Sequence, residues 1–241
     1  MKPTDFSRSL TDYLTRYLPE ERGSSHNTIL AYKDTFLLFI TFMQETEKVK
    51  ADRLDFKMIT RDRIVAYLDW LQGQRHCSSS TRNARLACFH SFFRYLQYQL
   101  PAGLYDWQQI MSIPLKRTEK QSMNYLSLDG IRSLLASPDV KEKRGRRDLA
   151  LLSLMYDTGA RVQEIIDLTP AMIRLDKPCT IKLIGKGNKA RIVPLLDAQV
   201  ELLHRYMSEY RLTEPFANQY PLFFNSRKEK LTRSGVTYIL K

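Results

Sequence analysis

The sequence predicts two domains, a mainly α-helical bundle followed by an α+β domain with a small antiparallel sheet. In the first half, apolar residues recur at spacings of three and four, the period of an amphipathic helix. In the second half, two short β-like runs flank a glycine-containing turn. Residues 113–123 are polar, charged and non-periodic, as in an exposed linker. We therefore expect a helical domain over 1–112, a linker over 113–123 and the α+β domain over 124–241.

Four helices are expected in the first domain. Their apolar spacing places them, in order, at residues 10–18, 27–44, 60–72 and 79–99. Thr60 suits the N-cap of the third helix, and Asp62 in its first turn complements the helix dipole. Pro19 and Gly23 are expected to separate the first helix from the second.

The second domain is predicted to combine helices with one β-hairpin. The expected helices span residues 128–136, 147–157, 161–167 and 200–210, with a last one after Thr232. The helix over 147–157 is apolar on nearly every face, so we expect it to be buried. Residues 180–184 and 191–195 flank a loop that contains Gly185 and Gly187, which predicts a hairpin with a turn of five or six residues.

Positive charge is concentrated in the second half of the chain. The formal net charge is +12 over 241 residues. Residues 1–112 hold 15 Lys and Arg against 12 Asp and Glu, whereas residues 113–241 hold 23 against 14. Clustered cations release counterions from a phosphate backbone, which favours a nucleic acid partner over an acidic membrane. A protein that is merely basic remains the alternative on composition alone.

Other classes of site and location are not indicated by the sequence. The three cysteines, Cys77, Cys88 and Cys179, are odd in number and lack metal-ligand spacing. We expect reduced thiols, no metal site and no cofactor. The N-terminal residues contain no apolar signal core, and no run of about 18 apolar residues occurs. The sequence therefore predicts a cytoplasmic protein without a membrane span.

Two cations stand at positions suited to phosphate chemistry. Arg161 follows the predicted buried helix at a glycine break, and its guanidinium can contact two oxygens of one phosphate. Lys186 lies at the tip of the predicted hairpin, where an ammonium can place charge or donate a proton. The alternatives are a structural ion pair of Arg161 with Glu164 or Asp157, and an ordinary solvated turn at Lys186.

The combination of motifs resembles the tyrosine recombinase (phage integrase) family, including its Xer-type and transposon-borne members. Residues 158–165, TGARVQEI, resemble the first catalytic arginine motif, and residues 184–195, IGKGNKARIVPL, resemble the catalytic-lysine hairpin. Residues 26–32, 80–86 and 91–96 are similar to the helical, SAM-like core-binding domain of the family. The resemblance covers nearly the whole chain.

This resemblance implies a function and a set of roles. The family recombines DNA at specific sites, often as an integrase of a mobile element, through a 3′-phosphotyrosine intermediate. By resemblance Arg161 binds the scissile phosphate, Lys186 protonates the leaving 5′-oxygen or stabilises its charge, and Glu164 holds Arg161 in place. The implied partner is double-stranded DNA, with a homo-tetramer forming on DNA when the protein is full length.

The sequence departs from the family pattern after the hairpin. No His-x-x-Arg motif follows, and Tyr238 lies in the helix that ordinarily precedes that motif, so we assign no nucleophile. We expect the nucleophile to lie beyond Lys241 and this chain to be inactive for cleavage. The alternative function is a non-catalytic DNA-binding fragment, or a regulator of a full-length recombinase.

Six further residues are candidates for contact with DNA: Arg82, Arg85, Lys189, Arg191, Thr232 and Arg233. Arg82 and Arg85 are three apart on one predicted helix, where they are expected to meet the major groove or phosphates. Thr232 begins the last predicted helix, a position suited to a phosphate. The alternative for the arginines and for Lys189 is a solvated surface.

Overall fold

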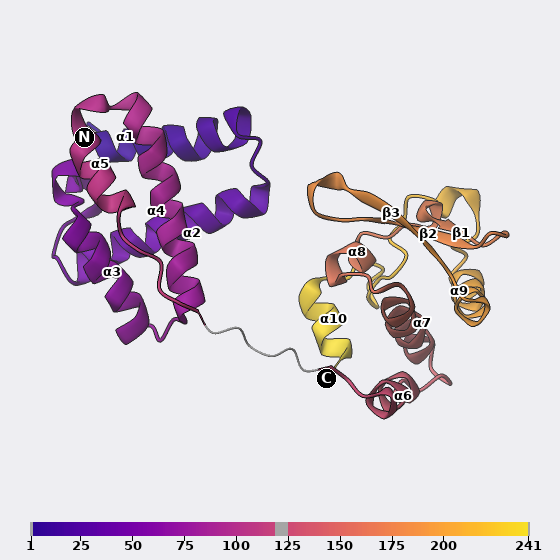
Figure 1. Cartoon of the computed structure of the whole chain (residues 1–241). Helices are drawn as coiled ribbons and strands as arrows, with labels where there is room; N and C mark the ends of the chain where they lie inside the picture. Colours follow the sequence, from indigo (N-terminus) through magenta and orange to yellow (C-terminus); the bar gives the residue numbers. More distant parts are fainter. Residues whose placement is uncertain (1, 119–124, 241) are drawn as a thin grey trace. The chain divides into compact units, whose positions relative to one another are not determined.

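The computed structural model describes residues 2–118 and 125–240, and the chain divides into two compact units, Met1–Ser122 and Met123–Lys241 (Figure 1). The first unit is helical, and the second packs helices around a three-stranded antiparallel sheet. The predicted fold class is therefore confirmed. None of the helices in the described residues is both long enough and apolar enough to cross a membrane.

The first unit consists of helices joined by short turns. Its helices are α1 (Asp5–Asp12), the π-helical segment η1 (Tyr13–Glu21), α2 (His26–Glu45), α3 (Arg61–Gly73), α4 (Ser79–Gln99) and α5 (Leu104–Met111), with 3₁₀ turns at Ala51–Arg53, Phe56–Met58 and Pro101–Gly103. Hydroxyl side chains at the N-caps fix where four of the helices begin. Thr4, Ser25, Thr60 and Ser78 each accept a hydrogen bond from the backbone N–H three residues later.

Two features of the first unit differ from the prediction. The first helix begins at Asp5 and continues as the π-helical segment to Glu21, so Pro19 lies inside it instead of ending it. The chain turns only at Gly23, which has a φ of +60°. Helix α5 was not predicted, because its eight residues follow the break at Pro101 and are too few to show a clear period.

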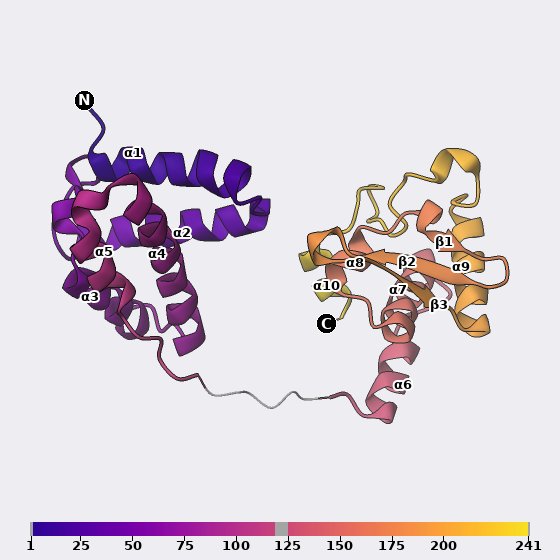
Figure 2. The ribbon, with the colours of Figure 1, turned by 45° about the horizontal axis from the view of Figure 1, so that its top comes forward.

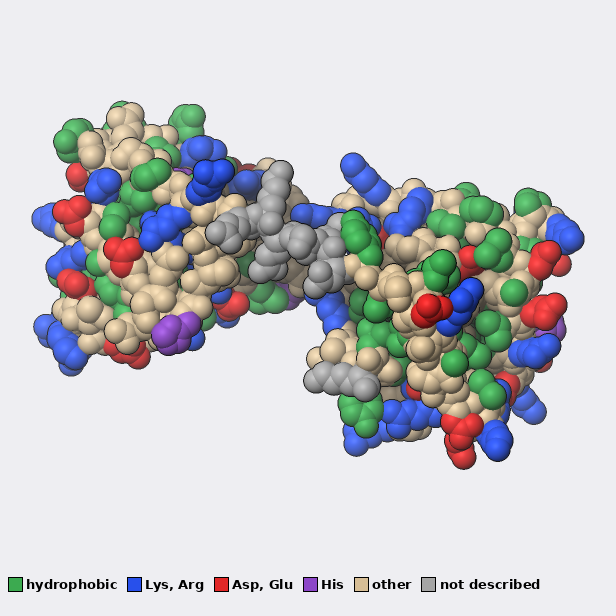
Figure 3. Space-filling model, turned by 60° about the horizontal axis from the view of Figure 1, so that its bottom comes forward, with side chains coloured by type: hydrophobic (Ala, Val, Ile, Leu, Met, Phe, Trp, Pro, Cys, Tyr) green, Lys and Arg blue, Asp and Glu red, His purple; other side chains and the backbone are tan. Residues whose placement is uncertain are grey.

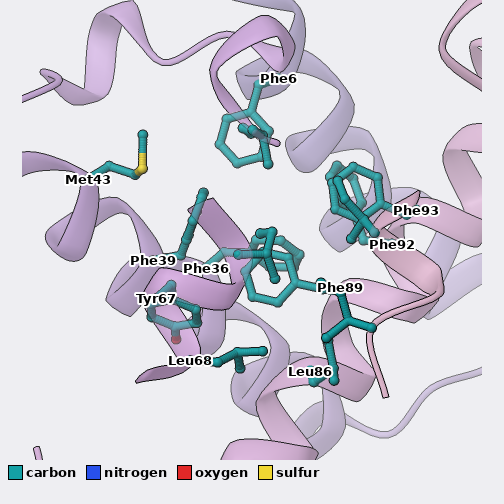
Figure 4. Close-up of a cluster of buried hydrophobic side chains, with 14 of the residues drawn as sticks. Phe6, Phe36, Phe39, Met43, Tyr67, Leu68, Leu86, Phe89, Phe92 and Phe93 are labelled. Atoms are coloured by element: carbon teal, nitrogen blue, oxygen red, sulfur yellow. The ribbon is translucent and has the colours of Figure 1, made fainter. Parts of the chain in front are cut away.

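Aromatic packing forms the core of the first unit (Figure 4). Phe39 on α2 lies against Phe89 on α4 and Tyr67 on α3, with ring centroids 5.2 and 5.4 Å apart. Phe36 contacts Phe89 at 5.1 Å. Because these rings come from three helices and are fully buried, they fix how the helices pack.

The first residues of the predicted linker pack on this helical unit. Ile113 is 3% exposed and belongs to its core. The Asn83 side chain bonds both backbone groups of Lys116, donating to its carbonyl at 2.7 Å and accepting from its N–H at 3.0 Å. The part of the predicted linker at 119–123 lies outside the described residues, so the exact domain boundaries remain a prediction.

The second unit places helices against the sheet (Figure 2). Its elements are α6 (Leu128–Ala136), α7 (Lys143–Thr158), α8 (Val162–Ile166), β1 (Ile173–Arg174), β2 (Thr180–Ile184), β3 (Ala190–Pro194), α9 (Asp197–Glu209) and α10 (Arg233–Ile239). The strand order is β1-β2-β3, and Leu183 pairs with Arg191 in the hairpin. The hairpin matches the prediction to within one residue, whereas the two-residue strand β1 was not predicted.

Helix α7 is the central support of the second unit. Ala150, Leu151 and Leu154 are fully buried, in agreement with the apolar sequence. The helix begins at Lys143, four residues before the predicted start, because its first turns are polar. Arg147 is buried there, where it donates to Asp148 at 2.8 Å and to the Phe224 carbonyl at 2.9 Å.

Gly145 provides a test of this packing. A methyl group at Gly145 would lie 1.9 Å from the Asp139 carbonyl oxygen, so the backbone would have to move. We expect Gly145→Ala to lower the free energy of unfolding by about 1–3 kcal/mol, measured by urea denaturation. The control is Gly235→Ala, whose methyl group would lie at ordinary contact distance, 3.4 Å from the Thr232 hydroxyl. Equal stability of the two variants would contradict the close approach.

Candidate active site

The candidate site is built where α7 ends and α8 begins. Gly159 ends α7 in the left-handed conformation, with a φ of +59°, which only glycine adopts without strain. The chain then turns through Ala160 and starts α8 with Arg161 at the N-cap. This turn brings Arg161 to the protein surface, where its side chain is 74% exposed.

One buried carboxylate organises the site. The Glu164 side chain is only 3% exposed, and each of its oxygens accepts two hydrogen bonds. Oε1 accepts from Arg161 Nη1 at 3.0 Å and from Arg191 Nη1 at 2.8 Å. Oε2 accepts from the Arg161 backbone N–H at 2.9 Å and from Arg191 Nη2 at 2.7 Å. These bonds, led by those from Arg191, lower the pKa of Glu164 to about 2 despite its burial.

The hairpin turn that carries Lys186 lies directly against this carboxylate. Gly185 donates its N–H to the Lys189 carbonyl at 2.8 Å and so closes the five-residue turn. A methyl group at Gly185 would lie 2.8 Å from Glu164 Oε1 and 3.8 Å from Arg161 Nη1. The turn therefore approaches both side chains within contact distance, and Lys186 is the next residue along the chain.

The two predicted cations are both accessible. Arg161 does pair with Glu164, as the structural alternative supposed, but most of its side chain stays exposed. Asp157, the other carboxylate considered, instead accepts from the Leu196 backbone N–H. Lys186 is exposed and makes no hydrogen bond or ion pair with any other described residue. The pairing thus orients Arg161 and leaves both cations open to a ligand.

The two α4 arginines that were predicted to contact DNA, Arg82 and Arg85, are not presented as predicted. Arg82 is only 4% exposed, because its spacing of four from Leu86 places it on the buried face of the helix. Arg82 therefore does not lie on an exposed helix face in this structure, which corrects the expectation of an accessible side chain. Arg85 is partly buried, and its Nη1 donates to the Ala31 carbonyl and the Thr35 hydroxyl of α2. Its bonds are thus made within the helical unit.

The remaining DNA-contact candidates lie in the second unit. Lys189 is exposed on the hairpin turn. Arg191 is committed to Glu164 instead of being free on the surface, because it lies on the inner side of β3 opposite buried Leu183. Thr232 caps α10 by accepting from the Gly235 N–H, and Arg233 is exposed and donates to the Gln163 side chain at 2.9 Å.

Sequence reasoning missed a second polar cluster on α8. The Gln163 side-chain amide donates to both carboxylate oxygens of Asp167 at 3.0 Å, and Lys230 also binds that carboxylate. The four-residue spacing of Gln163 and Asp167 was the available signal. This short helix therefore orients Arg233 and Lys230 as well as Arg161 and Arg191. Within 2–118 and 125–240, no group of three acidic, His or Cys side chains is arranged to hold a metal ion.

The lowered pKa of Glu164 predicts how the free energy of unfolding changes with pH. The carboxylate stabilises the fold fully above its ordinary pKa of 4.5, and this contribution is lost as the pH falls through about 2. We expect Glu164→Gln to lower the free energy of unfolding at pH 7 by about 1–2 kcal/mol, a figure reduced for the solvated arginine partners. The deficit should shrink between pH 4.5 and 2 in urea denaturation.

Glu201→Gln is the matched control for this prediction. Glu201 pairs with Arg205 on the surface of α9 at 3.7 Å, and its side chain is 72% exposed. Such pairs contribute little, so the control should match the unsubstituted chain at every pH. A Glu164→Gln deficit that does not change with pH would show that the carboxylate charge is not the source of the stabilisation.

Comparison with known sequences places both units in one family. Residues 124–241 match the phage integrase family, and residues 11–99 match the N-terminal SAM-like domain of phage integrase. The chain is 31% identical over 234 residues to tyrosine recombinase XerD of Listeria monocytogenes, covering 96% of this chain and 75% of XerD. It is 33% identical over 231 residues to integrase/recombinase y4rC of Sinorhizobium fredii, covering 96% of this chain and 68% of that protein.

Solved structures support the same fold. The XerH site-specific recombinase bound to palindromic difH substrate matches with a TM-score of 0.66 at 23% identity, covering 95% of this chain and 67% of XerH. A lambda integrase fragment bound to a core site matches with a TM-score of 0.64 at 14% identity, covering 96% of this chain and 78% of that one. From the sequence relatives and the family match, the chain belongs to the tyrosine recombinase (phage integrase) family.

Proposed function

We propose that this chain acts in site-specific DNA recombination, with Arg161 binding the scissile phosphate and Lys186 acting at the leaving oxygen. The observation that carries the proposal is an exposed guanidinium fixed by a buried carboxylate, next to a hairpin turn with an accessible lysine. An ordinary ion pair on the surface forms between two exposed side chains, whereas here the carboxylate is buried and accepts four hydrogen bonds. Such an arrangement suits a cation that must be held ready for an anionic ligand.

The chemistry assigned to the two cations follows from charge. When a tyrosine oxygen attacks the phosphorus of a phosphodiester, negative charge grows on the two non-bridging oxygens. The Arg161 guanidinium offers paired donors to those oxygens and lowers the barrier. As the bond from phosphorus to the 5′-oxygen breaks, the Lys186 ammonium donates a proton to that oxygen. The tyrosine loses its own proton and becomes bonded to the 3′-phosphate; no residue of this chain is assigned to that step.

The electrostatics of the chain support a duplex DNA partner. Lys and Arg side chains are spread over both units on the face shown in Figure 3, and the second half of the sequence carries the larger surplus. Lys189 and Arg233 are exposed in the same unit as Arg161. Thr232, at the N-cap of α10, is a further proposed phosphate contact. Because the chain belongs to this family, we also propose that the protein assembles into a homo-tetramer on DNA.

The related proteins support the same partner. XerH and lambda integrase were solved with their DNA sites bound, and the XerH complex is a post-cleavage one. A second candidate function is binding of duplex DNA without cleavage, as a regulator of a complete recombinase. It rests on the surplus of Lys and Arg in the second half of the sequence, which supports duplex binding without requiring cleavage. Formation of a covalent protein–DNA complex separates the two candidates.

Duplex binding should depend strongly on salt. Each phosphate contact by Lys or Arg releases counterions, so several contacts give a steep loss of affinity with salt. In an electrophoretic titration with a 30-base-pair duplex, we expect affinity to fall at least about tenfold between 50 and 200 mM NaCl. Affinity that is unchanged over this range would exclude a phosphate-contacting duplex-binding surface.

Arg161 should account for contact with one particular phosphate. We would select a binding site from a random duplex library and map it by phosphate ethylation interference. Arg161→Ala should abolish interference at one phosphate on each bound strand and reduce overall affinity by no more than about tenfold, because the other contacts persist. Lys186→Ala should preserve both the affinity and the footprint, since its role is assigned to the leaving oxygen.

Arg205→Ala is the control for this experiment. Arg205 is an exposed arginine of α9, which lies away from α8 within the same unit in Figures 1 and 2. Its removal loses the same charge and should leave every interference position unchanged. An Arg161→Ala footprint identical to that of the unsubstituted chain would refute the assignment of Arg161 to a phosphate.

A further inference from the structure

Arg191 makes a paired contact with the buried carboxylate of the site. Its two terminal nitrogens donate to the two oxygens of Glu164 at 2.8 and 2.7 Å, the paired geometry that holds a carboxylate in one orientation. Arg191 therefore supplies two of the four hydrogen bonds that hold the carboxylate that orients Arg161, and both come from its side chain.

The same contact fixes the hairpin to α8. Arg191 lies in β3, five residues after Lys186 and on the other side of the same turn. Glu164 lies in α8, three residues after Arg161. The pair of bonds between Arg191 and Glu164 consequently joins the element that carries Lys186 to the element that carries Arg161. Gly185 completes the contact, because the absence of a side chain there lets the turn approach Glu164 Oε1.

Arg161 depends on this carboxylate for its position. Among the described residues, Glu164 is the only one that pairs with the Arg161 guanidinium, through one hydrogen bond at 3.0 Å. A long side chain that is 74% exposed would otherwise sample many rotamers. If the Glu164 carboxylate rotated, Oε1 would move away from Arg161 Nη1, and the guanidinium would lose its fixed orientation.

We propose that Arg191 is a positioning residue, which locks the Glu164 carboxylate and thereby sets both the orientation of Arg161 and the distance of the Lys186 turn from it. Its consequence for DNA rests on the function proposed above, whereas the lock itself is a property of the free protein. The two can therefore be tested separately.

The lock is tested first, without DNA, by the titration of Glu164. In protein labelled with ¹³C at the glutamate side chains, the Glu164 carboxyl signal should titrate at about pH 2 in the unsubstituted chain. The charged groups that contact this carboxylate are Arg161 and Arg191. In Arg191→Met, the midpoint should move up towards the ordinary carboxyl value. Arg191→Lys should restore only part of the shift, because an ammonium is a single point of charge.

Lys182→Met is the matched control. Lys182 is an exposed cation on the neighbouring strand β2, and it pairs with Ile192 on the opposite face of the hairpin from Arg191. Removing it loses the same charge at a similar place in the sequence, and the Glu164 midpoint should not move. A Glu164 midpoint that is the same in Arg191→Met as in the unsubstituted chain would overturn the proposal.

The consequence for DNA is tested by ethylation interference on the selected duplex. Arg191→Lys keeps the charge, so we expect its affinity to stay within about threefold of the unsubstituted chain. Interference at the phosphate that depends on Arg161 should nevertheless fall, as it does in Arg161→Ala. Full interference in Arg191→Lys would overturn the positioning role and leave a merely electrostatic one.

These outcomes separate the proposal from the function on which it rests. If Arg161→Ala itself leaves the footprint unchanged, the proposed function fails, while the titration of Glu164 still reports whether Arg191 locks the carboxylate. If Arg161→Ala changes the footprint and Arg191→Lys does not, the proposed function stands and the positioning role fails. A folded state of each variant is verified by its ¹H–¹⁵N spectrum, so loss of the fold is not mistaken for loss of the lock.

Discussion

The candidate site depends on one buried carboxylate held between two guanidinium groups. Glu164 is removed from water, and its charge is stabilised by four hydrogen bonds from Arg161 and Arg191. Burial alone would raise the pKa of this carboxyl group, so the lowered value reflects donors that outweigh desolvation. The Glu164 carboxyl group therefore stays ionised throughout the physiological pH range, and it continues to orient the exposed Arg161.

The rest of the second unit supports this arrangement. Helix α7 forms a buried apolar base, and Gly159 ends it in a conformation that turns the chain sharply into α8. The hairpin then contacts α8 through a glycine, where a side chain would collide with the carboxylate. The guanidinium groups of Arg161 and Arg191 can lie close together because the Glu164 carboxylate lies between them. Without it, two adjacent guanidinium groups would repel each other.

The first unit is stabilised differently, by aromatic side chains from several helices and by hydroxyl caps at the helix starts. Its arginines on α4 mostly serve this packing. Arg85 ties α4 to α2 through the Ala31 carbonyl and the Thr35 hydroxyl, and Arg82 is buried.

The sequence by itself determined the fold class, most helices and the family, because caps, apolar periods and the two motifs are local patterns. It also identified Arg161, Glu164 and Lys186 as candidates. Only the tertiary structure showed that Arg82 is buried and that Arg191 pairs with Glu164, because the spacing of charged residues along the chain does not show which long side chains turn inward. The partner that turns Arg191 inward, Glu164, is 27 residues away in sequence and becomes its neighbour only when the hairpin packs on α8.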